Sequence, residues 1–101
     1  MAIEIPLDQP RIADFCRRHH IRSLALFGSV LRDDFTANSD VDVLVRFHPE
    51  HVPGFAFARM QEELGEILGR RVDLSTPGFL SPSIRERVER EAHPLYDADR
   101  R

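Results

Sequence analysis

The sequence predicts a small α/β domain in which helices flank a mixed β-sheet. Short apolar runs of strand-like composition alternate with longer segments whose apolar residues recur at helical spacing. The chain has 101 residues, of which 42% are hydrophobic, and we find no internal repeat or low-complexity linker. A chain of this length buries about 60 to 70% of its unfolded surface around one core, so we expect a single domain over residues 1–101.

The predicted elements alternate along the chain. Segments with helical periodicity or helix-start signals are expected to form helices at about 8–19, 29–32, 55–68 and 82–91. Short apolar runs are expected to form strands at about 22–27, 41–47, 71–74 and 94–96.

In the first half of the chain, cap and turn residues set the element boundaries. Asp8 or Gln9 followed by Pro10 can open the first helix, because proline is tolerated in a first helical turn. Gly28 follows the first apolar run and is typical of a tight turn at a strand end. The next apolar run, 41–45, is interrupted by one acidic residue and otherwise has the composition of a buried strand.

In the second half, the segment 48–54 contains two prolines and a glycine and breaks the pattern. The helix that follows is amphipathic, and its inward-facing side chains are predicted to be Phe57, Met60, Leu64, Ile67 and Leu68. Gly69 is expected to stop this helix, and Ser81 with Pro82 to start the last one. The last strand is predicted at an edge of the sheet, where Pro94 is tolerated.

Charge and cysteine content exclude several functions. The formal net charge is -3 and the sequence pI is about 5.9, with both signs mixed along the chain, so no clustered basic face for nucleic-acid binding is expected. Cys16 is the single cysteine, which excludes an internal disulfide. We see no secretion leader and no apolar run near ~18 residues, so we expect a cytoplasmic protein without membrane insertion.

The most informative segment is 28–42, in which a Gly28-Ser29 pair and ten further residues precede Asp40-Val41-Asp42. Because side chains alternate across a strand, Asp40 and Asp42 are expected on the same face, separated by roughly 6 to 7 Å of strand rise. Two carboxylates on one face repel each other unless a cation lies between them, and oxygen ligands of this kind suit Mg²⁺ or Mn²⁺.

The Gly28-Ser29 turn is a candidate phosphate-binding turn. Glycine allows a phosphate to approach the backbone closely, and the Ser29 hydroxyl and nearby N–H groups can hold phosphate oxygens. A carboxylate-held metal beside a phosphate site indicates phosphoryl or nucleotidyl transfer. In the alternative interpretation these residues are only turn formers and caps. That interpretation explains Asp40 but not Asp42, an acid inside an apolar strand where an unpaired carboxylate is costly.

On these residues the chain resembles the nucleotidyltransferase superfamily with the DNA polymerase beta type of palm, and within it the minimal nucleotidyltransferase (MNT) family. The likeness covers nearly the whole chain, through segments 23–29, 40–45, 66–69, 71–74 and 92–96. It implies a palm-like fold and a single minimal nucleotidyltransferase domain over residues 1–101. It also implies ATP as substrate, Mg²⁺ with two ions, and the antitoxin role of HEPN/MNT toxin–antitoxin modules, whose partner is a helical HEPN ribonuclease toxin.

The resemblance also implies a third acid, for which Asp73 in the strand after Gly69 is the candidate. If that strand neighbours the strand of Asp42, three carboxylates come together. In a two-metal scheme Asp40 and Asp42 would bind both ions, and Asp73 would bind the ion nearer the nucleophile and accept its proton. Alternatively, Asp73 is an edge-strand acid that faces solvent.

The chain departs from the family pattern Gly-Ser-Arg-Ala-Arg-Gly beside the phosphate turn. Arg32 stands at the second arginine and is the candidate for neutralising nucleotide phosphates, or else it forms an ion pair on the helix surface. Val30 replaces the first arginine and Asp33 replaces the glycine, so reduced activity is one expectation. For Phe55 and Phe57, either packing of the helix or a place beside the nucleotide is expected, with packing the more frequent use.

The leading hypothesis from the resemblance is a Mg²⁺-dependent transfer of AMP from ATP to a hydroxyl, such as a tyrosine, of a partner HEPN toxin, with which the chain forms a hetero-oligomer. The competing hypotheses are an antitoxin that neutralises its toxin by binding alone, and a nucleotidyltransferase for a small molecule such as an aminoglycoside. The small-molecule hypothesis is disfavoured because 101 residues leave no room for an acceptor-binding domain. The nucleotide preference, the acceptor residue and the stoichiometry stay open.

Overall fold

The computed structural model describes residues 5, 7–32, 35–36, 38–51 and 53–99. The helices are α1 (Gln9–Arg18), α2 (Ala56–Leu68) and α3 (Pro82–Glu91), with short 3-10 helices η1 (Gly28–Leu31) and η2 (Pro77–Phe79). The strands are β1 (Ile21–Phe27), β2 (Val41–Phe47), β3 (Val72–Ser75) and β4 (His93–Asp97). Each predicted element is present, and most of the predicted boundaries shift by one residue.

The four strands form one mixed sheet in the order β3-β2-β1-β4. β1 lies in the centre and pairs antiparallel with β2 and with β4, whereas β2 and β3 run parallel. The parallel pair is possible because α2 carries the chain back across one face of the sheet between the two strands. The predicted mixed sheet is confirmed, and β3 and β4 are its edges.

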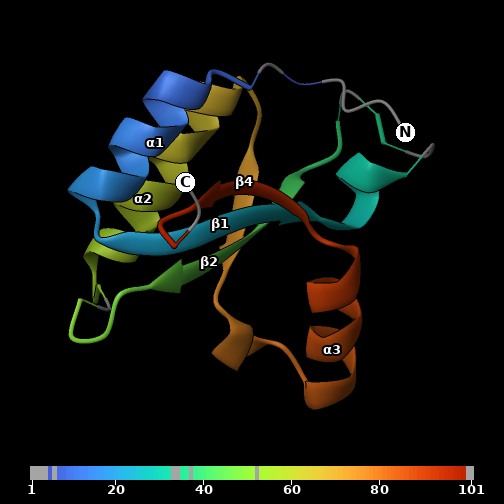
Figure 1. Ribbon diagram of the computed structural model, residues 1–101. Coiled ribbons are helices and arrows are strands. Elements are labelled where there is room, and N and C mark those ends of the chain that lie inside the picture. Colours follow the sequence, from blue (N-terminus) through green and yellow to red (C-terminus); the bar gives the residue numbers. More distant parts are fainter. Residues whose placement is uncertain (1–4, 6, 33–34, 37, 52, 100–101) are drawn as a thin grey trace.

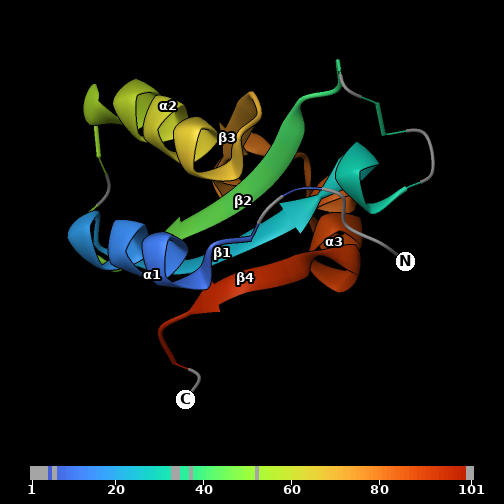
Figure 2. The same cartoon turned by 90° about the horizontal axis from the view of Figure 1, so that it is seen from above.

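The helices lie on both faces of the sheet. Figure 1 shows α1 and α2 side by side on one face and α3 on the opposite side, and Figure 2 shows α1 and α2 from above. The main hydrophobic core fills the space between the sheet and the α1–α2 pair, with fully buried Phe15, Leu24 and Leu64 among its members. On the other face, Leu44 of β2 and Val88 of α3 are buried outside this core.

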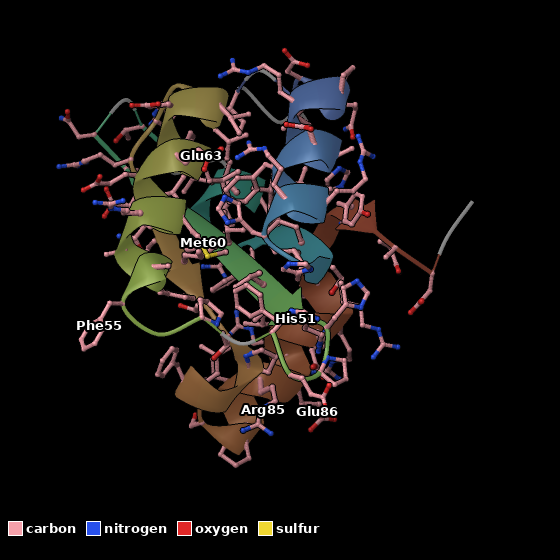
Figure 3. All side chains as sticks on the ribbon, turned by 90° about the vertical axis from the view of Figure 1, so that its left-hand side faces the viewer. His51, Phe55, Met60, Glu63, Arg85 and Glu86 are labelled. Atoms are coloured by element: carbon pink, nitrogen blue, oxygen red, sulfur yellow. The ribbon has the colours of Figure 1, made fainter. Side chains whose placement is uncertain are left out.

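Local signals in the sequence explain how α1 begins and how it is held beside α2. The Asp8 carboxylate accepts a hydrogen bond from the Arg11 backbone N–H at 3.2 Å and so caps the helix N-terminus. At the other end Arg18 and His19 both bond to Glu63 of α2, which lies between the two helices in Figure 3. The hydrogen bond from Arg18 is the main cause that lowers the pKa of Glu63.

The end of α2 sets the direction of β3. Gly69 adopts a left-handed conformation with φ of 70°, and its N–H bonds to the carbonyl of Gly65, so the predicted glycine stop is confirmed.

The start of α2 corrects the expectation that Phe55 packs against the helix. Phe55 is fully exposed and points away from the molecule, as Figure 3 shows, because it precedes the helix, where the inward-facing stripe has not begun. Phe57 is partly buried, and its ring lies edge-on to Phe47 at 6.4 Å.

Cys16 is fully buried in α1, and this burial raises the pKa of its thiol to about 12. It therefore serves as a core residue, as its helical spacing predicts. Across the described ranges, no helix is both long and apolar enough to cross a membrane.

Candidate active site

The site forms where β1 ends beside β2. Phe27, the last residue of β1, pairs with Asp42, so the chain enters η1 directly next to the Asp42 side chain. Gly28 adopts φ of 76°, and a Cβ atom at this position would lie 2.3 Å from Asp42 Oδ2. Both the left-handed backbone and this contact require glycine. The predicted tight turn after the first strand is confirmed, and its glycine packs against an acid of the motif.

Two of the predicted acids lie opposite each other on neighbouring strands. Asp42 of β2 and Asp73 of β3 are register partners in the parallel pair, whose strands are about 4.8 Å apart. Their chain neighbours, among them Val43 and Leu74, are buried in the core under α1 and α2. Because side chains alternate, both carboxylates project from the other face of the sheet. The two strands are therefore neighbours, which is the condition that the hypothesis of a third acid sets.

Burial and the neighbouring charges both change the pKa of Asp42. Burial raises the pKa of Asp42 above its ordinary value, and the charges of Asp73 and of Asp40 raise it further. The guanidinium of Arg32 acts in the opposite direction. Asp42 is thus half-buried, and the charges of the other two predicted acids and of the predicted phosphate-binding arginine act on it.

Asp40 has a different environment from the other two acids. It precedes β2, is largely exposed, and its Oδ1 lies 3.0 Å from Arg71 Nε. Within residues that the structure describes, no three acidic, histidine or cysteine side chains converge in a geometry that could hold a metal ion. The Asp40 carboxylate would therefore have to turn away from Arg71 to share an ion with Asp42.

Two consecutive arginines, which the sequence analysis did not assign to the site, hold the segment that leads to Asp40. Arg70 donates hydrogen bonds to the carbonyls of Thr36 and Ser39, and its guanidinium lies 4.4 Å from the centre of the Phe35 ring. Arg71 donates to the Asn38 carbonyl at 2.9 Å. The only sequence signal was their place directly after the helix-stopping glycine. These contacts make Arg70 and Arg71 positioning residues for Asp40.

The remaining predicted residues lie in or beside η1. Ser29 is half-buried in η1, and its carbonyl accepts a hydrogen bond from the Arg32 N–H at 2.9 Å. Val30 is only 2% exposed and belongs to the main core, so its side chain points away from the surface on which a phosphate would bind. Asp33 lies outside the described residues, and the expectation for that position stays a prediction.

The donor set fits a hard divalent cation. Asp42 and Asp73 are carboxylates on adjacent strands that project from the same face. Burial, and after it the charges of Asp73 and Asp40, raise the pKa of Asp42, and a bound cation would offset the repulsion between these charges. Carboxylate oxygens are the protein ligands that Mg²⁺ and Mn²⁺ prefer, with water and phosphate oxygens completing the shell. The glycine turn lies next to these acids, so an ion and a phosphate could share the site.

Comparisons with known proteins show the family of this chain. The family model for the nucleotidyltransferase domain matches residues 10–95. The protein adenylyltransferase MntA of Thermococcus cleftensis is 39% identical over 75 residues, which are 73% of this chain and 74% of that protein. The chain belongs to the nucleotidyltransferase domain family, as its resemblance implied.

Solved structures give the same fold. A protein assigned to the minimal nucleotidyltransferases matches with a TM-score of 0.69 and 37% identity, and the match covers 85% of this chain and 87% of that one. A toxin–antitoxin structure with AMP-PNP matches with a TM-score of 0.71 at 22% identity, over 92% of this chain and 76% of that one. The predicted palm-like fold of the minimal nucleotidyltransferases is confirmed.

Replacing Gly28 by alanine tests the tight contact with Asp42. Both Gly28 and Gly69 have left-handed backbones, but a Cβ at Gly69 meets nothing within 4 Å. We expect Gly69→Ala to cost about 1 kcal/mol of stability through the backbone alone and to leave nucleotidyl transfer unchanged. Gly28→Ala should lose more stability and slow transfer roughly a hundredfold, because Asp42 must move. Equal transfer rates in the two variants would contradict a catalytic role for this contact.

Neutralising Asp42 tests the cost of holding its carboxylate half-buried beside two other acids. Because its pKa is raised in the folded state, the ionised carboxylate opposes folding at neutral pH. We expect Asp42→Asn, measured without divalent cations, to raise the thermal unfolding midpoint by roughly 2 to 4 °C. Asp14→Asn is the matched control, since Asp14 pairs with Arg18 at 2.8 Å and gains nothing when neutralised. A lower midpoint for Asp42→Asn than for the wild type would show that the ionised carboxylate does not oppose folding.

Proposed function

We propose that this chain is a Mg²⁺-dependent adenylyltransferase that moves AMP from ATP onto a tyrosine hydroxyl of a partner HEPN toxin and thereby acts as its antitoxin. The observation that carries the proposal is the close grouping of Asp42, Asp73 and Gly28 in a chain of the nucleotidyltransferase domain family. A site for a cation lies beside a turn that can receive phosphate, which is the arrangement that nucleotidyl transfer needs.

Each residue of the site has its own role in the proposed reaction. Asp40, Asp42 and Asp73 are the catalytic and metal-binding carboxylates, and two Mg²⁺ ions bound there would polarise the α-phosphate and lower the pKa of the attacking hydroxyl. Asp73, which is more exposed than Asp42, accepts the proton of that hydroxyl. Gly28 and Ser29 hold phosphate oxygens through the backbone and the hydroxyl, and Arg32 balances phosphate charge.

A protein acceptor is favoured by the comparisons. The relative from Thermococcus cleftensis is named a protein adenylyltransferase, and one structural neighbour is a tri-AMPylated HEPN toxin of Shewanella oneidensis in complex with its MNT antitoxin. Asp73 lies on an edge strand and is exposed, so the side of the site that receives the acceptor is accessible to another chain. ATP and Mg²⁺ are both present in the cytoplasm. The proposal therefore includes a hetero-oligomer with the toxin in that compartment.

Neutralisation by binding alone is the second candidate. Two observations favour it. The Asp40 carboxylate pairs with Arg71, and Val30 supplies no phosphate-binding side chain. An antitoxin of this kind would need the surface of the chain but not its carboxylates.

Incubating the purified chain with labelled ATP, Mg²⁺ and a candidate HEPN toxin partner tests the proposal. We expect label on the toxin with the wild type, and at least a hundredfold less with Asp40→Ala/Asp42→Ala, because the ions and the α-phosphate lose their ligands. Toxin growth inhibition is measured in parallel. If the double variant still suppresses the toxin fully and the wild type transfers no label, neutralisation by binding is correct and the proposed enzyme is not.

A further inference from the structure

A cavity of about 270 Å³ lies between η1 and the last helix, α3. Phe27, Gly28 and Arg32 line it from the end of β1 and from η1. The α3 residues that line it from the opposite side are Ile84, Arg87, Val88 and Glu91. The chain thus encloses a space between two segments that are more than fifty residues apart in the sequence.

This cavity shares Gly28 and Arg32 with the candidate active site. Gly28, which lines it, packs against the Asp42 carboxylate, and the charge of Arg32 acts on the pKa of Asp42. α3 lies on the side of the sheet opposite α1 and α2, as Figure 1 shows, and this is the side from which Asp42 and Asp73 project. A molecule with one end at Asp42 can therefore extend past Gly28 into this space.

The charges of the cavity indicate the kind of group that it receives. Arg32 lines the cavity beside η1 and Arg87 lines it from α3, and guanidinium groups bind phosphate through pairs of N–H donors. Arg87 is paired with Glu91 one helical turn away, at 3.5 Å, and both side chains are more than half exposed. A long, exposed pair of this type contributes little to stability, so a phosphate can replace Glu91 as the partner of Arg87.

We propose that this cavity binds the terminal phosphates of the nucleotide and that Arg87, together with Arg32, holds the departing pyrophosphate. The inference rests on the proposed function. In the transfer step the acceptor oxygen bonds to the α-phosphorus, the bond from that phosphorus to the bridging oxygen breaks, and pyrophosphate leaves with the electron pair. The acceptor proton passes to Asp73. Arg87 stabilises the charge that develops on the pyrophosphate, a contribution that Val30 cannot make from within the core.

Ligand titrations followed by NMR test this assignment, with ATP, pyrophosphate and AMP as separate probes in the presence of Mg²⁺. We expect Arg87→Gln to weaken ATP and pyrophosphate about tenfold, the loss of one charge-assisted contact, and to leave AMP unchanged. Glu91→Gln should bind pyrophosphate at least as tightly as the wild type, because a competing carboxylate is removed. Arg90→Gln is the matched control, since Arg90 is an exposed arginine of α3 that does not line the cavity.

The outcomes separate this inference from the proposed function. If the wild type binds ATP, and Arg87→Gln binds ATP and pyrophosphate as tightly as the wild type does, the assignment of Arg87 is wrong and the adenylyltransferase proposal stands. If Arg87→Gln weakens AMP as much as ATP, the cavity receives the nucleoside and the phosphate assignment is overturned. If the wild type binds neither ATP nor pyrophosphate, the proposed function itself fails. Thermal unfolding of each variant confirms that the fold is retained.

Discussion

The contact between Gly28 and the Asp42 carboxylate is the constraint on which the rest of the site depends. It exists because β1 pairs with β2 in the register that places Phe27 opposite Asp42, so the turn after β1 closes directly over that acid. The parallel pairing of β2 with β3 then places Asp73 on the other side of Asp42. One carboxylate is thus flanked by a turn that can bind phosphate and by a second acid. Its burial in this place, and after it the charge of Asp73, raises its pKa.

Arginines from three parts of the fold lie around this concentration of negative charge. Arg32 follows η1, Arg71 pairs with Asp40 from the start of β3, and Arg70 fixes the segment that leads to Asp40. Arg87 of α3 adds a further guanidinium across the neighbouring cavity. The rigid layer of α1, α2 and the sheet supports these groups, because the core side chains of β2 and β3 alternate with the acids.

The sequence predicted the elements and the sides of the strands well because both follow from local periodicity. Alternation alone places the Asp42 side chain on the face of the sheet away from the buried Val41 and Val43, and Gly69 alone ends α2. The pairing of Asp40 with Arg71 and the place of Arg87 beside η1 could not be predicted, since they depend on which distant segments meet. Phe55 was misjudged because hydrophobicity does not show that a residue lies just before the first turn of a helix.

The most direct test of the central claim, that Asp42 and Asp73 form one cation site beside the glycine turn, is binding of Mn²⁺ with ATP measured by electron paramagnetic resonance. The wild type is predicted to bind the Mn²⁺–ATP complex, and Asp42→Asn and Asp73→Asn each to weaken it at least about tenfold. Asp99→Asn, which removes an exposed acid paired with Arg22 near the C-terminus, is predicted to have no effect. Wild-type affinity in both Asp42→Asn and Asp73→Asn would contradict the account.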